Sequence, residues 1–304
     1  MTRPKVAVRP QADLIERAVE AGGGVITDPA DADVIVWMDH RDPEGLRKLL
    51  ETSKARWVQL PFAGIEAFFA AGVIDPALTW TCAKGAYGQV TAEHALALVL
   101  LAARRLDVHV RARTWQRDPG ARRMDELTVL IIGAGGIGRA LAAMLAPLRA
   151  RVLAASGSGA AMPGAERTVA SDLLAEVLPE ADVVVVAAPS TERTRGMVGA
   201  AAFARMKPGA WLVNVARGDL VDTGALLEAL RSEQLGGAAL DVVDPEPLPD
   251  EHPLWTMPNV VITSHTANTA RMAIDPLAAM VEHNVRAFAA GEALQGVVDV
   301  EKGY

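Results

Sequence analysis

Residues 127–138 read LTVLIIGAGGIG, and this stretch decides the fold of the chain. The four apolar residues at 129–132 predict a strand that is buried on both faces. Apolar residues then recur at spacings of three and four over 137–148, which predicts a helix that begins inside the turn. The turn has glycine at its first, third and sixth positions, namely Gly133, Gly135 and Gly138.

A strand, a G-x-G-x-x-G turn and a helix in this order are typical of dinucleotide binding. Gly133 permits the tight turn, Gly135 lets the backbone approach a pyrophosphate, and Gly138 lets helix and strand pack closely. The helix N-terminus adds N–H groups and a partial positive charge. We therefore predict a dinucleotide site here, with a tight turn that binds no ligand as the alternative.

The composition indicates a large globular protein. Its 304 residues are 51% hydrophobic, enough for a sizeable core and about two domains. The net charge of -7 argues against nucleic acid or an anionic membrane as a partner. The single cysteine, Cys82, excludes an internal disulfide and fits a reducing compartment. With no signal-peptide core and no apolar run long enough to span a bilayer, we expect a soluble, cytoplasmic protein.

Short apolar runs alternate with helical patterns, which predicts α/β layers with mainly parallel sheets. Before the glycine turn, we expect strands at 5–8, 33–37, 57–60 and 78–82, and helices at 13–21, 43–50, near 67 and at 90–106. After it, we expect strands at 152–155, 183–188, 211–215, 238–242 and 260–263, and helices at 173–178, 223–231 and 269–290. Pro276 is expected to kink the last helix or to mark its restart.

Two segments indicate how the domains are connected. The segment 107–126 contains proline and glycine, and we interpret it as the crossing into the second domain. Asp107 and Asp118 interrupt the arginine-rich stretch 104–123, which therefore reads as a solvated face or a subunit contact. The tail 296–300 has no obvious place in the second sheet, so we expect it to return to the first domain.

The second strand of the predicted dinucleotide fold ends in LAASGS, with Ser156 where an acid is expected. In NAD enzymes that acid, about 20 positions past the glycines, bonds the ribose hydroxyls, and Asp172 is too far along to replace it. Ser156 and Ser158 can hydrogen-bond a 2′-phosphate. The arginine that usually clamps this phosphate is missing at Gly157, and Arg167 would have to reach in. The choice between NAD and NADP stays open, and binding of both with a modest preference is the simpler reading.

Specific motifs follow in order after residue 188. They are APSTERTRG (188–196), MKPGA (206–210), NVARG (214–218), ALDV (239–242), EPLP (246–249), HPLW (252–255) and TSH (263–265). Two more precede them, QLPFAG (59–64) and TAEH (91–94). In their order and spacing, these motifs resemble the D-isomer-specific 2-hydroxyacid dehydrogenase family over essentially the whole chain.

The resemblance implies a fold and its domains. A Rossmann doubly wound parallel sheet is inserted in a smaller flavodoxin-like α/β substrate domain. Residues 1–100 plus 271–304 would form the substrate domain and residues 101–270 the NAD(P)-binding domain, with the active site in the cleft between them. A homodimer is implied too, mainly through the cofactor domain. Because the chain ends at Tyr304, we expect no C-terminal regulatory domain of the kind that many phosphoglycerate dehydrogenases carry.

Three residues match the catalytic triad of that family, and their chemistry suits a 2-keto acid. Arg217, a planar cation after a strand, suits bidentate binding of the substrate carboxylate and can polarise the carbonyl. His265 suits donation of a proton to the alkoxide that hydride transfer leaves, and acts as base in reverse. Glu246, nineteen residues earlier, would hydrogen-bond the imidazole and raise its pKa. Each alone is more often structural, but together they indicate the triad.

The resemblance also implies contacts with the cofactor and the substrate. The expected cofactor contacts are Gly133, Gly135, Gly136, Ile137 and Gly138 at the pyrophosphate, Ser156, Pro189 and Thr194 on the adenosine side, and Val215, Ala216, Arg217, Asp241, His265 and Asn268 on the nicotinamide side, with Asp241 at the nicotinamide amide. The backbone at Ala63 and Gly64 would hold the substrate carboxylate alongside Arg217. We expect no metal, because no spacing of His, Cys and carboxylates suggests one.

Two residues depart from the family pattern near this site. Ser264 stands where proline usually precedes the histidine, and Asn268 stands where glycine is frequent. We expect both to alter cofactor or substrate contacts without abolishing the chemistry. His94, on the long apolar helix, is interpreted as a satisfied core or interface histidine.

The leading hypothesis is an NAD(P)-dependent reductase of small 2-keto acids, or a dehydrogenase of the matching D-2-hydroxy acids. Relatives of this length suggest glyoxylate and hydroxypyruvate as substrates, while the preferred direction stays open. Formate dehydrogenases resemble this pattern but carry glutamine beside the histidine, so Glu246 argues against that activity. The alternative from another class is an NAD(H)-sensing binding protein of the corepressor type on the same fold, whose long extra termini we do not expect here.

Overall fold

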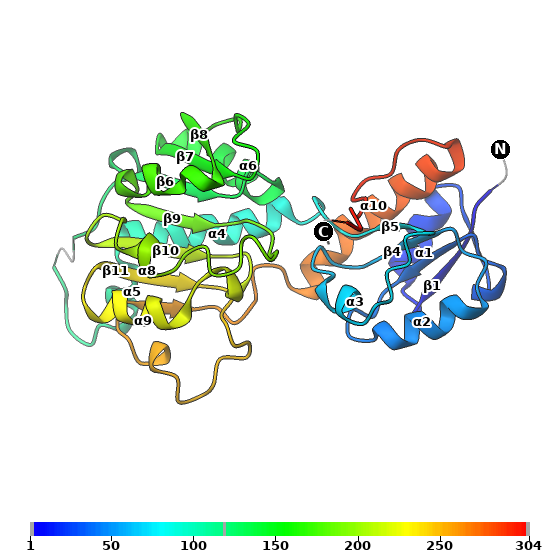
Figure 1. Ribbon diagram of the computed structural model, residues 1–304, viewed down its shortest axis with the longest axis horizontal. Helices are drawn as coiled ribbons and strands as arrows, with labels where there is room; N and C mark the ends of the chain where they lie inside the picture. Colours follow the sequence, from blue (N-terminus) through cyan, green and yellow to red (C-terminus); the bar gives the residue numbers. More distant parts are fainter. Residues whose placement is uncertain (1–2, 118–119, 302–304) are drawn as a thin grey trace. The chain divides into compact units, whose positions relative to one another are not determined.

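The computed structural model describes residues 3–117 and 120–301. Two residues named above, Asp118 and Tyr304, lie outside the described residues. Contacts divide the chain into two compact units, one of Met1–Tyr87 with Ala270–Tyr304 and the other of Gly88–Thr269. The second unit is therefore inserted in the first, and each contains one parallel sheet (Figure 1).

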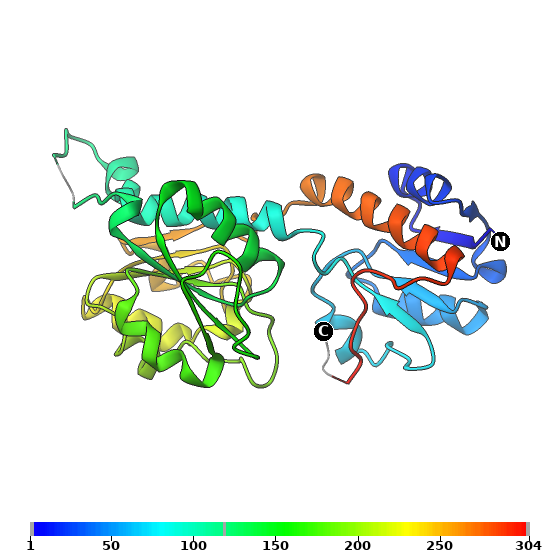
Figure 2. The same ribbon diagram turned by 90° about the horizontal axis from the view of Figure 1, so that it is seen from above.

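The sheet of the first unit has the flavodoxin-like strand order β2-β1-β3-β4-β5. Its strands are β1 (Lys5–Arg9), β2 (Val25–Ile26), β3 (Val34–Trp37), β4 (Trp57–Gln59) and β5 (Thr79–Thr81). Helices α1 (Asp13–Ala21) and α10 (Ala270–Ala290) cover one face, and α2 (Pro43–Thr52) and α3 (Glu66–Ala70) cover the other (Figure 2). Along β1, Val6 and Val8 pack towards α1 and α10 whereas Ala7 packs on the opposite face, because strand side chains alternate.

The tail after α10 returns to the sheet of the first unit, as predicted. Val297 forms an antiparallel bridge with Thr81 of β5. The fully buried amide of Asn284 donates to Oε1 of Gln59 at 3.1 Å and to the carbonyl oxygen of Gln295 at 3.0 Å. One buried side chain therefore ties α10, the tail and β4 together.

The sheet of the second unit has the order β12-β11-β10-β9-β6-β7-β8, which is the Rossmann order with one further strand. Its strands are β6 (Thr128–Ile132), β7 (Arg151–Ser156), β8 (Arg167–Ala170), β9 (Val183–Val186), β10 (Ala210–Asn214), β11 (Leu235–Leu240) and β12 (Val260–Ile262). Helices α4 (Gly88–Arg104) and α6 (Gly136–Leu145) cover one face, and α7 (Leu174–Val177), α8 (Ala200–Phe203) and α9 (Thr223–Arg231) cover the other. The predicted doubly wound α/β fold is confirmed.

The division between the units falls between Tyr87 and Gly88, earlier than residue 100, where the resemblance suggested it. Helix α4 belongs to the second unit because its buried Ala95 and Val99 lie in the same core as Leu141 of α6. The polar segment after α4 is therefore not the crossing between the units. It follows α4 within the second unit.

The long helix expected over 90–106 is two helices. Arg105 has a left-handed φ of 50° and ends α4, and α5 (Leu106–Arg111) follows it. Arg111 donates to the carbonyl oxygens of Pro258 at 2.9 Å and Val260 at 2.6 Å. This arginine therefore anchors α5 to β12, so the arginine-rich stretch is not simply a solvated face.

Other differences from the prediction are local. The edge strands β2 and β8 were not predicted, because they are short, partly exposed and lack an apolar run. Pro276 lies inside a continuous α10, so the helix does not restart there. Short 3-10 turns complete the elements: Pro29–Asp31, Met124–Glu126, Ala146–Leu148, Ser171–Leu173, Leu178–Glu180, Gly218–Leu220 and Pro253–Trp255. Two of them flank α7, which covers residues 174–177 of the helix expected at 173–178.

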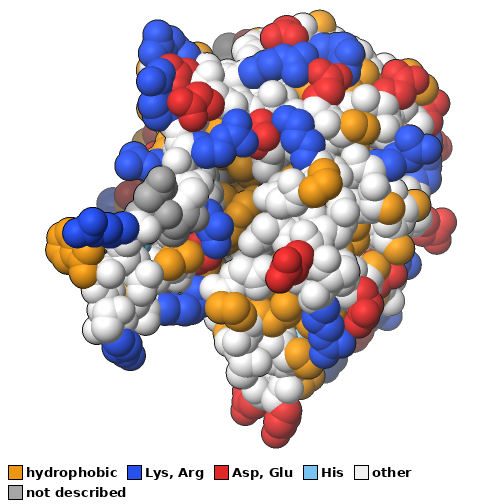
Figure 3. All heavy atoms as spheres, turned by 90° about the vertical axis from the view of Figure 1, so that its left-hand side faces the viewer, with side chains coloured by type: hydrophobic (Ala, Val, Ile, Leu, Met, Phe, Trp, Pro, Cys, Tyr) orange, Lys and Arg blue, Asp and Glu red, His pale blue; other side chains and the backbone are white. Residues whose placement is uncertain are grey.

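One face of the second unit is mixed in charge. Figure 3 shows basic and acidic side chains intermingled on one face, with apolar side chains between them. Two of the most exposed large apolar residues follow α4, with Val110 at 71% and Trp115 at 91% exposure. In the described part of the chain, no helix combines the length and apolar character that crossing a membrane requires.

Candidate active site

The glycine turn joins β6 to α6, whose first residue is Gly136. Gly133 has φ 119°, and a Cβ there would lie 2.5 Å from the carbonyl oxygen of Ala187. A Cβ on Gly138 would lie 2.0 Å from the carbonyl oxygen of Gly133, whereas one on Gly135 would meet nothing within 4 Å. The turn is thus closed at both ends and open in the middle. This shape fits a pyrophosphate held against Gly135 and the N-terminal N–H groups of α6.

Two serine hydroxyls lie at the turn after β7, where the ribose-binding acid is missing. The Ser156 hydroxyl accepts a hydrogen bond from the N–H of Gly159 at 3.2 Å. The Ser158 hydroxyl accepts one from the N–H of Ala160 at 3.2 Å. Each hydroxyl keeps its own hydrogen for donation, so the turn can offer two O–H donors to a ligand.

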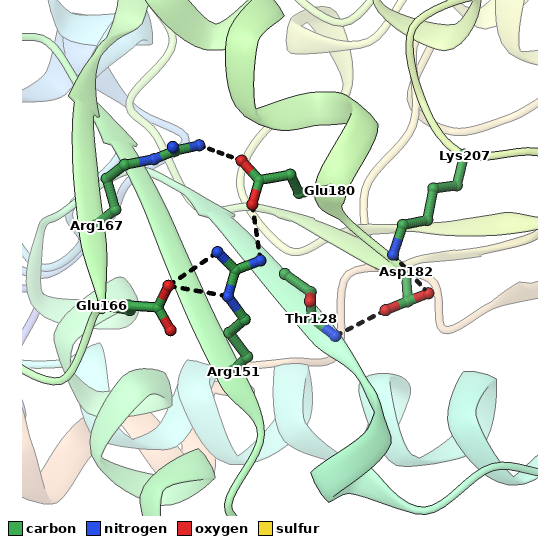
Figure 4. Close-up of polar contacts among 7 residues, drawn as sticks. All are labelled: Thr128, Arg151, Glu166, Arg167, Glu180, Asp182 and Lys207. Carbon is green, nitrogen blue, oxygen red and sulfur yellow. Dashed lines mark hydrogen bonds and ion pairs between the residues drawn. The ribbon is translucent and has the colours of Figure 1, made fainter.

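Arg167 does not lie at this turn. It opens β8 opposite Leu153, whereas Ser156 lies opposite Ala170, three residues further along the strand or about 10 Å. Its guanidinium forms an ion pair with Glu180 and points towards that carboxylate in Figure 4. Arg167, which would have to reach in to clamp a 2′-phosphate, is paired with Glu180 instead.

Arg217 follows β10 in a turn held by a buried amide. Asn214, the last residue of β10, is 1% exposed. Its Oδ1 accepts from the N–H of Ala216 at 3.1 Å, and its Nδ2 donates to the carbonyl oxygen of Arg217 at 2.9 Å. The guanidinium also donates to the carbonyl oxygen of Ala216 at 2.7 Å. Val215 and Ala216 are buried as well, so both packing and the hydrogen bonds of Asn214 hold the turn that presents Arg217.

His265 and Glu246 are in direct contact. Nδ1 of His265 lies 2.6 Å from Oε1 of Glu246, and the two side chains are 50% and 40% exposed. A carboxylate can only accept, so Nδ1 carries a hydrogen and Nε2 remains for another partner. Arg217, Glu246 and His265 follow β10, β11 and β12, which are neighbours in the sheet (Figure 1). All three therefore lie at its carboxyl edge, where ligands bind in such sheets.

Asp241 follows β11 at the same edge, and its side chain is 1% exposed. It accepts hydrogen bonds from the Thr263 hydroxyl at 2.6 Å and from the N–H groups of Thr266 at 2.8 Å and Ala267 at 3.1 Å. Burial acts to raise the pKa of the Asp241 carboxyl, but these bonds and one from His94 outweigh it and hold the pKa below its usual range. The carboxylate is therefore ionised at neutral pH. Its expected contact with the nicotinamide amide stays a prediction.

The other predicted contacts lie in three places. Pro189 and Thr194 share the loop after β9, where the Thr194 hydroxyl donates to the Pro189 carbonyl oxygen at 2.8 Å. Oδ1 of Asn268 is buried without a hydrogen-bond partner among the described residues. Ala63 and Gly64 follow β4 in the first unit, so their contact with the substrate stays a prediction.

Sequence reasoning missed three side chains that organise this edge. Asn214 and Thr263 were read only as parts of motifs, and His94 was read as a core or interface histidine. A polar residue that ends a fully apolar parallel strand is the signal that was available for Asn214. Over the residues that the structure describes, no group of three or more His, Cys, Asp and Glu side chains is placed to hold a metal ion.

Known proteins resemble the chain in sequence and in fold. The family model for D-isomer specific 2-hydroxyacid dehydrogenase, NAD binding domain, matches residues 95–267. The chain belongs to this family. A Corynebacterium melassecola protein, named uncharacterized protein in proB 3′region, is 42% identical over 94% of this chain and 95% of its own length. Glyoxylate/hydroxypyruvate reductase A of Serratia proteamaculans is 36% identical over 70% of this chain and 68% of its own length.

A solved structure extends the likeness to the whole fold. The crystal structure of a D-isomer specific 2-hydroxyacid dehydrogenase from Xanthobacter autotrophicus Py2, in complex with NADPH and MES, has a TM-score of 0.87 and 28% identity. The match covers 100% of both chains. The chain is accordingly a D-2-hydroxyacid dehydrogenase, an oxidoreductase that uses NAD or NADP. The predicted resemblance is confirmed.

Proposed function

We propose that this dehydrogenase interconverts small 2-keto acids and D-2-hydroxy acids, with His265 as the group that gives and takes the substrate proton. One observation carries the proposal. Nδ1 of His265 lies 2.6 Å from Oε1 of Glu246, at the same sheet edge as Arg217. An imidazole whose Nδ1–H is held by a carboxylate keeps one ring orientation, and in its protonated form it can donate the proton on Nε2.

Each residue of this set has one task. Bound NAD(P)H supplies the hydride to the carbonyl carbon. Arg217 pairs with the substrate carboxylate and draws electron density towards the carbonyl oxygen. His265 Nε2 donates its proton to that oxygen as the C–O π bond breaks, and Glu246 keeps the ring in place. In the oxidation direction, Nε2 takes the hydroxyl proton back.

The proposed substrates are glyoxylate and hydroxypyruvate, and both forms of the cofactor are accepted. Support for the substrates comes from the name of the Serratia relative. Support for NADPH comes from the serine hydroxyls of Ser156 and Ser158 and from the NADPH in the Xanthobacter structure. No carboxylate stands at Ser156 to repel a 2′-phosphate. The backbone of Ala63 and Gly64 is proposed to hold the substrate carboxylate alongside Arg217.

A spectrophotometric panel tests this proposal. Glyoxylate, hydroxypyruvate, pyruvate and bulkier 2-keto acids are each assayed with NADH and with NADPH. We expect turnover of glyoxylate and hydroxypyruvate with both cofactors. His265→Asn should lower kcat about 10²–10⁴-fold, because a positioned acid contributes a factor of that size, while the dissociation constant of the cofactor changes little. Wild-type kcat in His265→Asn would mean that another group donates the proton.

We also propose that the protein is a homodimer that associates through the second unit. The support is the resemblance to the family, and the candidate contact is the segment after α4, where Val110 is 71% and Trp115 is 91% exposed. Sedimentation equilibrium of the wild type should give twice the monomer mass. Trp115→Ala should shift this equilibrium towards monomer, and a monomeric wild type at all concentrations would exclude the dimer.

A further inference from the structure

The loop that carries His265 is folded around one buried carboxylate. Three groups of this loop donate to Asp241, namely the Thr263 hydroxyl and the N–H groups of Thr266 and Ala267. The backbone N–H of His265 itself donates to the Asp241 carbonyl oxygen at 2.6 Å. A carboxylate offers about four acceptor positions, so this single loop uses most of them.

Two residues of the loop have an unfavourable backbone conformation. Ser264 has φ 48° and His265 has φ 57°, in the left-handed region that favours glycine. Such residues cost about 1–3 kcal/mol each and persist only where the surroundings impose them. Successive N–H groups that converge on one anion form a recognised type of binding concavity. The hydrogen bonds to Asp241 therefore supply the constraint that keeps His265 in this conformation.

Helix α4 also contacts the Asp241 carboxylate, through His94. Nε2 of His94 lies 2.9 Å from the Thr263 hydroxyl oxygen and 3.4 Å from Oδ1 of Asp241. The Thr263 hydroxyl donates to Asp241, so the ring nitrogen of His94 that faces this oxygen is its donor. The chain of contacts runs from α4 through Thr263 and Asp241 to the residue that carries the imidazole. No bond in it involves the imidazole of His265.

We propose that His94, Thr263 and Asp241 form a positioning device that fixes the proton donor for hydride transfer. The inference rests on the proposed role of His265, and it goes further by assigning tasks to three side chains that do not touch it. Asp241 acts through its negative charge, which attracts the hydroxyl and N–H donors of the loop. Thr263 and His94 act by holding that carboxylate in one orientation. Loss of the device leaves His265 present but displaced from the substrate oxygen.

The central experiment compares Thr263→Val, which removes only the hydroxyl, with Thr263→Ser, which keeps it. Thr263→Val should lower kcat about tenfold, because small displacements of a reacting group cost up to a hundredfold, and Thr263→Ser should restore most of the rate. His94→Leu and His94→Gln form a second matched pair, since glutamine can still donate to the threonine hydroxyl. Asp241→Asn should show the largest fall, about a hundredfold in kcat.

Three readouts separate positioning from a general structural role. The solvent deuterium isotope effect on kcat should rise in Thr263→Val and His94→Leu, because proton transfer becomes limiting. In these same two variants, the KM for glyoxylate, the melting temperature and the dissociation constant of NADPH should stay close to those of the wild type. Unchanged kcat and isotope effect in Thr263→Val would overturn the inference. So would a weaker NADPH affinity at unchanged kcat, because it would make Asp241 and its partners a nicotinamide contact only.

The inference and the proposed function fail in different ways. If His265→Asn retains wild-type turnover, the assigned proton donor is wrong and the device has nothing to position. If His265→Asn is inactive but Thr263→Val and His94→Leu are fully active, the proton donor stands and only the device is rejected.

Discussion

At the amino edge of the seven-stranded sheet, charged side chains pair with one another near solvent, whereas at the carboxyl edge polar side chains pair with the backbone out of solvent. Arg151 bonds Glu166 at 2.8 Å and Glu180 at 2.7 Å, and all three side chains are about a third to three-fifths exposed (Figure 4). Asn214 and Asp241 at the opposite edge are 1% and 2% exposed, and both bind main-chain groups of the next turn.

The two edges therefore have different roles: the ion pairs of the amino edge contribute to stability, and the buried polar groups of the carboxyl edge position functional residues. An exposed ion pair between long side chains contributes about 0–1 kcal/mol and tolerates change. A buried carboxylate or amide that gathers main-chain N–H groups specifies a backbone conformation, and its loss leaves those groups unpaired. The carboxyl edge therefore holds the residues that present Arg217 and His265. Substitution of the residues that present Arg217 and His265 should lower activity, whereas substitution at the amino edge should change only stability.

Among the variants that test this comparison, the largest effect is expected for Arg217→Lys at the carboxyl edge. Lysine keeps the charge but loses the planar fork that binds a carboxylate through two parallel hydrogen bonds. We expect kcat/KM for glyoxylate to fall about 10²–10³-fold, as when one preorganised donor is removed from an active site. Steady-state kinetics measure this change, and thermal melts should show an unchanged fold. A fall of less than threefold would place carboxylate binding elsewhere.

A matched pair of glycine variants tests the turn at the same edge. In Gly138→Ala, the new Cβ would lie 2.0 Å from the Gly133 carbonyl oxygen, so the fold should lose about 1–3 kcal/mol of stability. In Gly135→Ala, the Cβ meets open space, so stability should be kept. The Cβ would instead fill the room for the pyrophosphate and raise the cofactor dissociation constant about tenfold, or 1.4 kcal/mol. Urea titrations and fluorescence titrations with NADPH measure the two quantities, and equal behaviour of both variants would contradict the assignment.

Much of this fold was predictable from local pattern. The parallel strands are buried on both faces and appear as continuous apolar runs, as in VVVV at 183–186. The glycine turn marks the start of α6. The alternation of apolar strands with helical segments predicts both parallel sheets. The break between α4 and α5 was not predictable, because a left-handed Arg105 leaves no mark in an otherwise helical pattern. The partly exposed edge strands β2 and β8 have no apolar run to reveal them.

The sequence predicted the reacting residues of the candidate site but not the residues that hold them in place. Motif order brought Arg217, Glu246 and His265 together, and the structure places two of them in contact. The bonds around Asp241 join residues that are far apart in sequence. His94 lies on α4, and the six strands β6 to β11 of the same sheet separate this helix from Asp241 in the chain. Only the tertiary fold creates that proximity. The left-handed φ of His265 is likewise a consequence of those bonds and not of local propensity.

Asp182→Asn sharpens the comparison, because Asp182 lies at the amino edge and is only 12% exposed. Burial acts to raise the pKa of its carboxyl, but the Thr128 N–H, Arg122 and Lys207 outweigh it and hold the pKa below its usual range. A lowered folded-state pKa gives stability that is present above the unfolded value of about 3.9 and is lost as pH falls through the folded value.

At pH 7, Asp182→Asn should therefore destabilise the protein by about 1–3 kcal/mol, with kcat unchanged. Urea unfolding at pH 7 and at about pH 3 measures the effect, since pH 3 lies below the usual carboxyl pKa. The difference in unfolding free energy between wild type and variant should shrink at the lower pH. A constant difference at both values would mean that the charge of Asp182 contributes nothing. If the difference shrinks as expected, burial of the side chain, and not the edge alone, sets the stability that a substitution removes.

The smallest effect is expected for Arg151→Met, also at the amino edge. The ion pairs of Arg151 with Glu166 and Glu180 are close, but its partners are exposed enough for solvent to screen them. Methionine keeps the apolar part of the side chain, so the free energy of unfolding should fall by less than about 1 kcal/mol. Urea unfolding in low salt and in 1 M NaCl should bring wild type and variant together, because salt removes the contribution that the variant has lost. A loss as large as that of Asp182→Asn, insensitive to salt, would show that the network acts as a buried cluster and that the two edges do not differ in the way their exposure indicates.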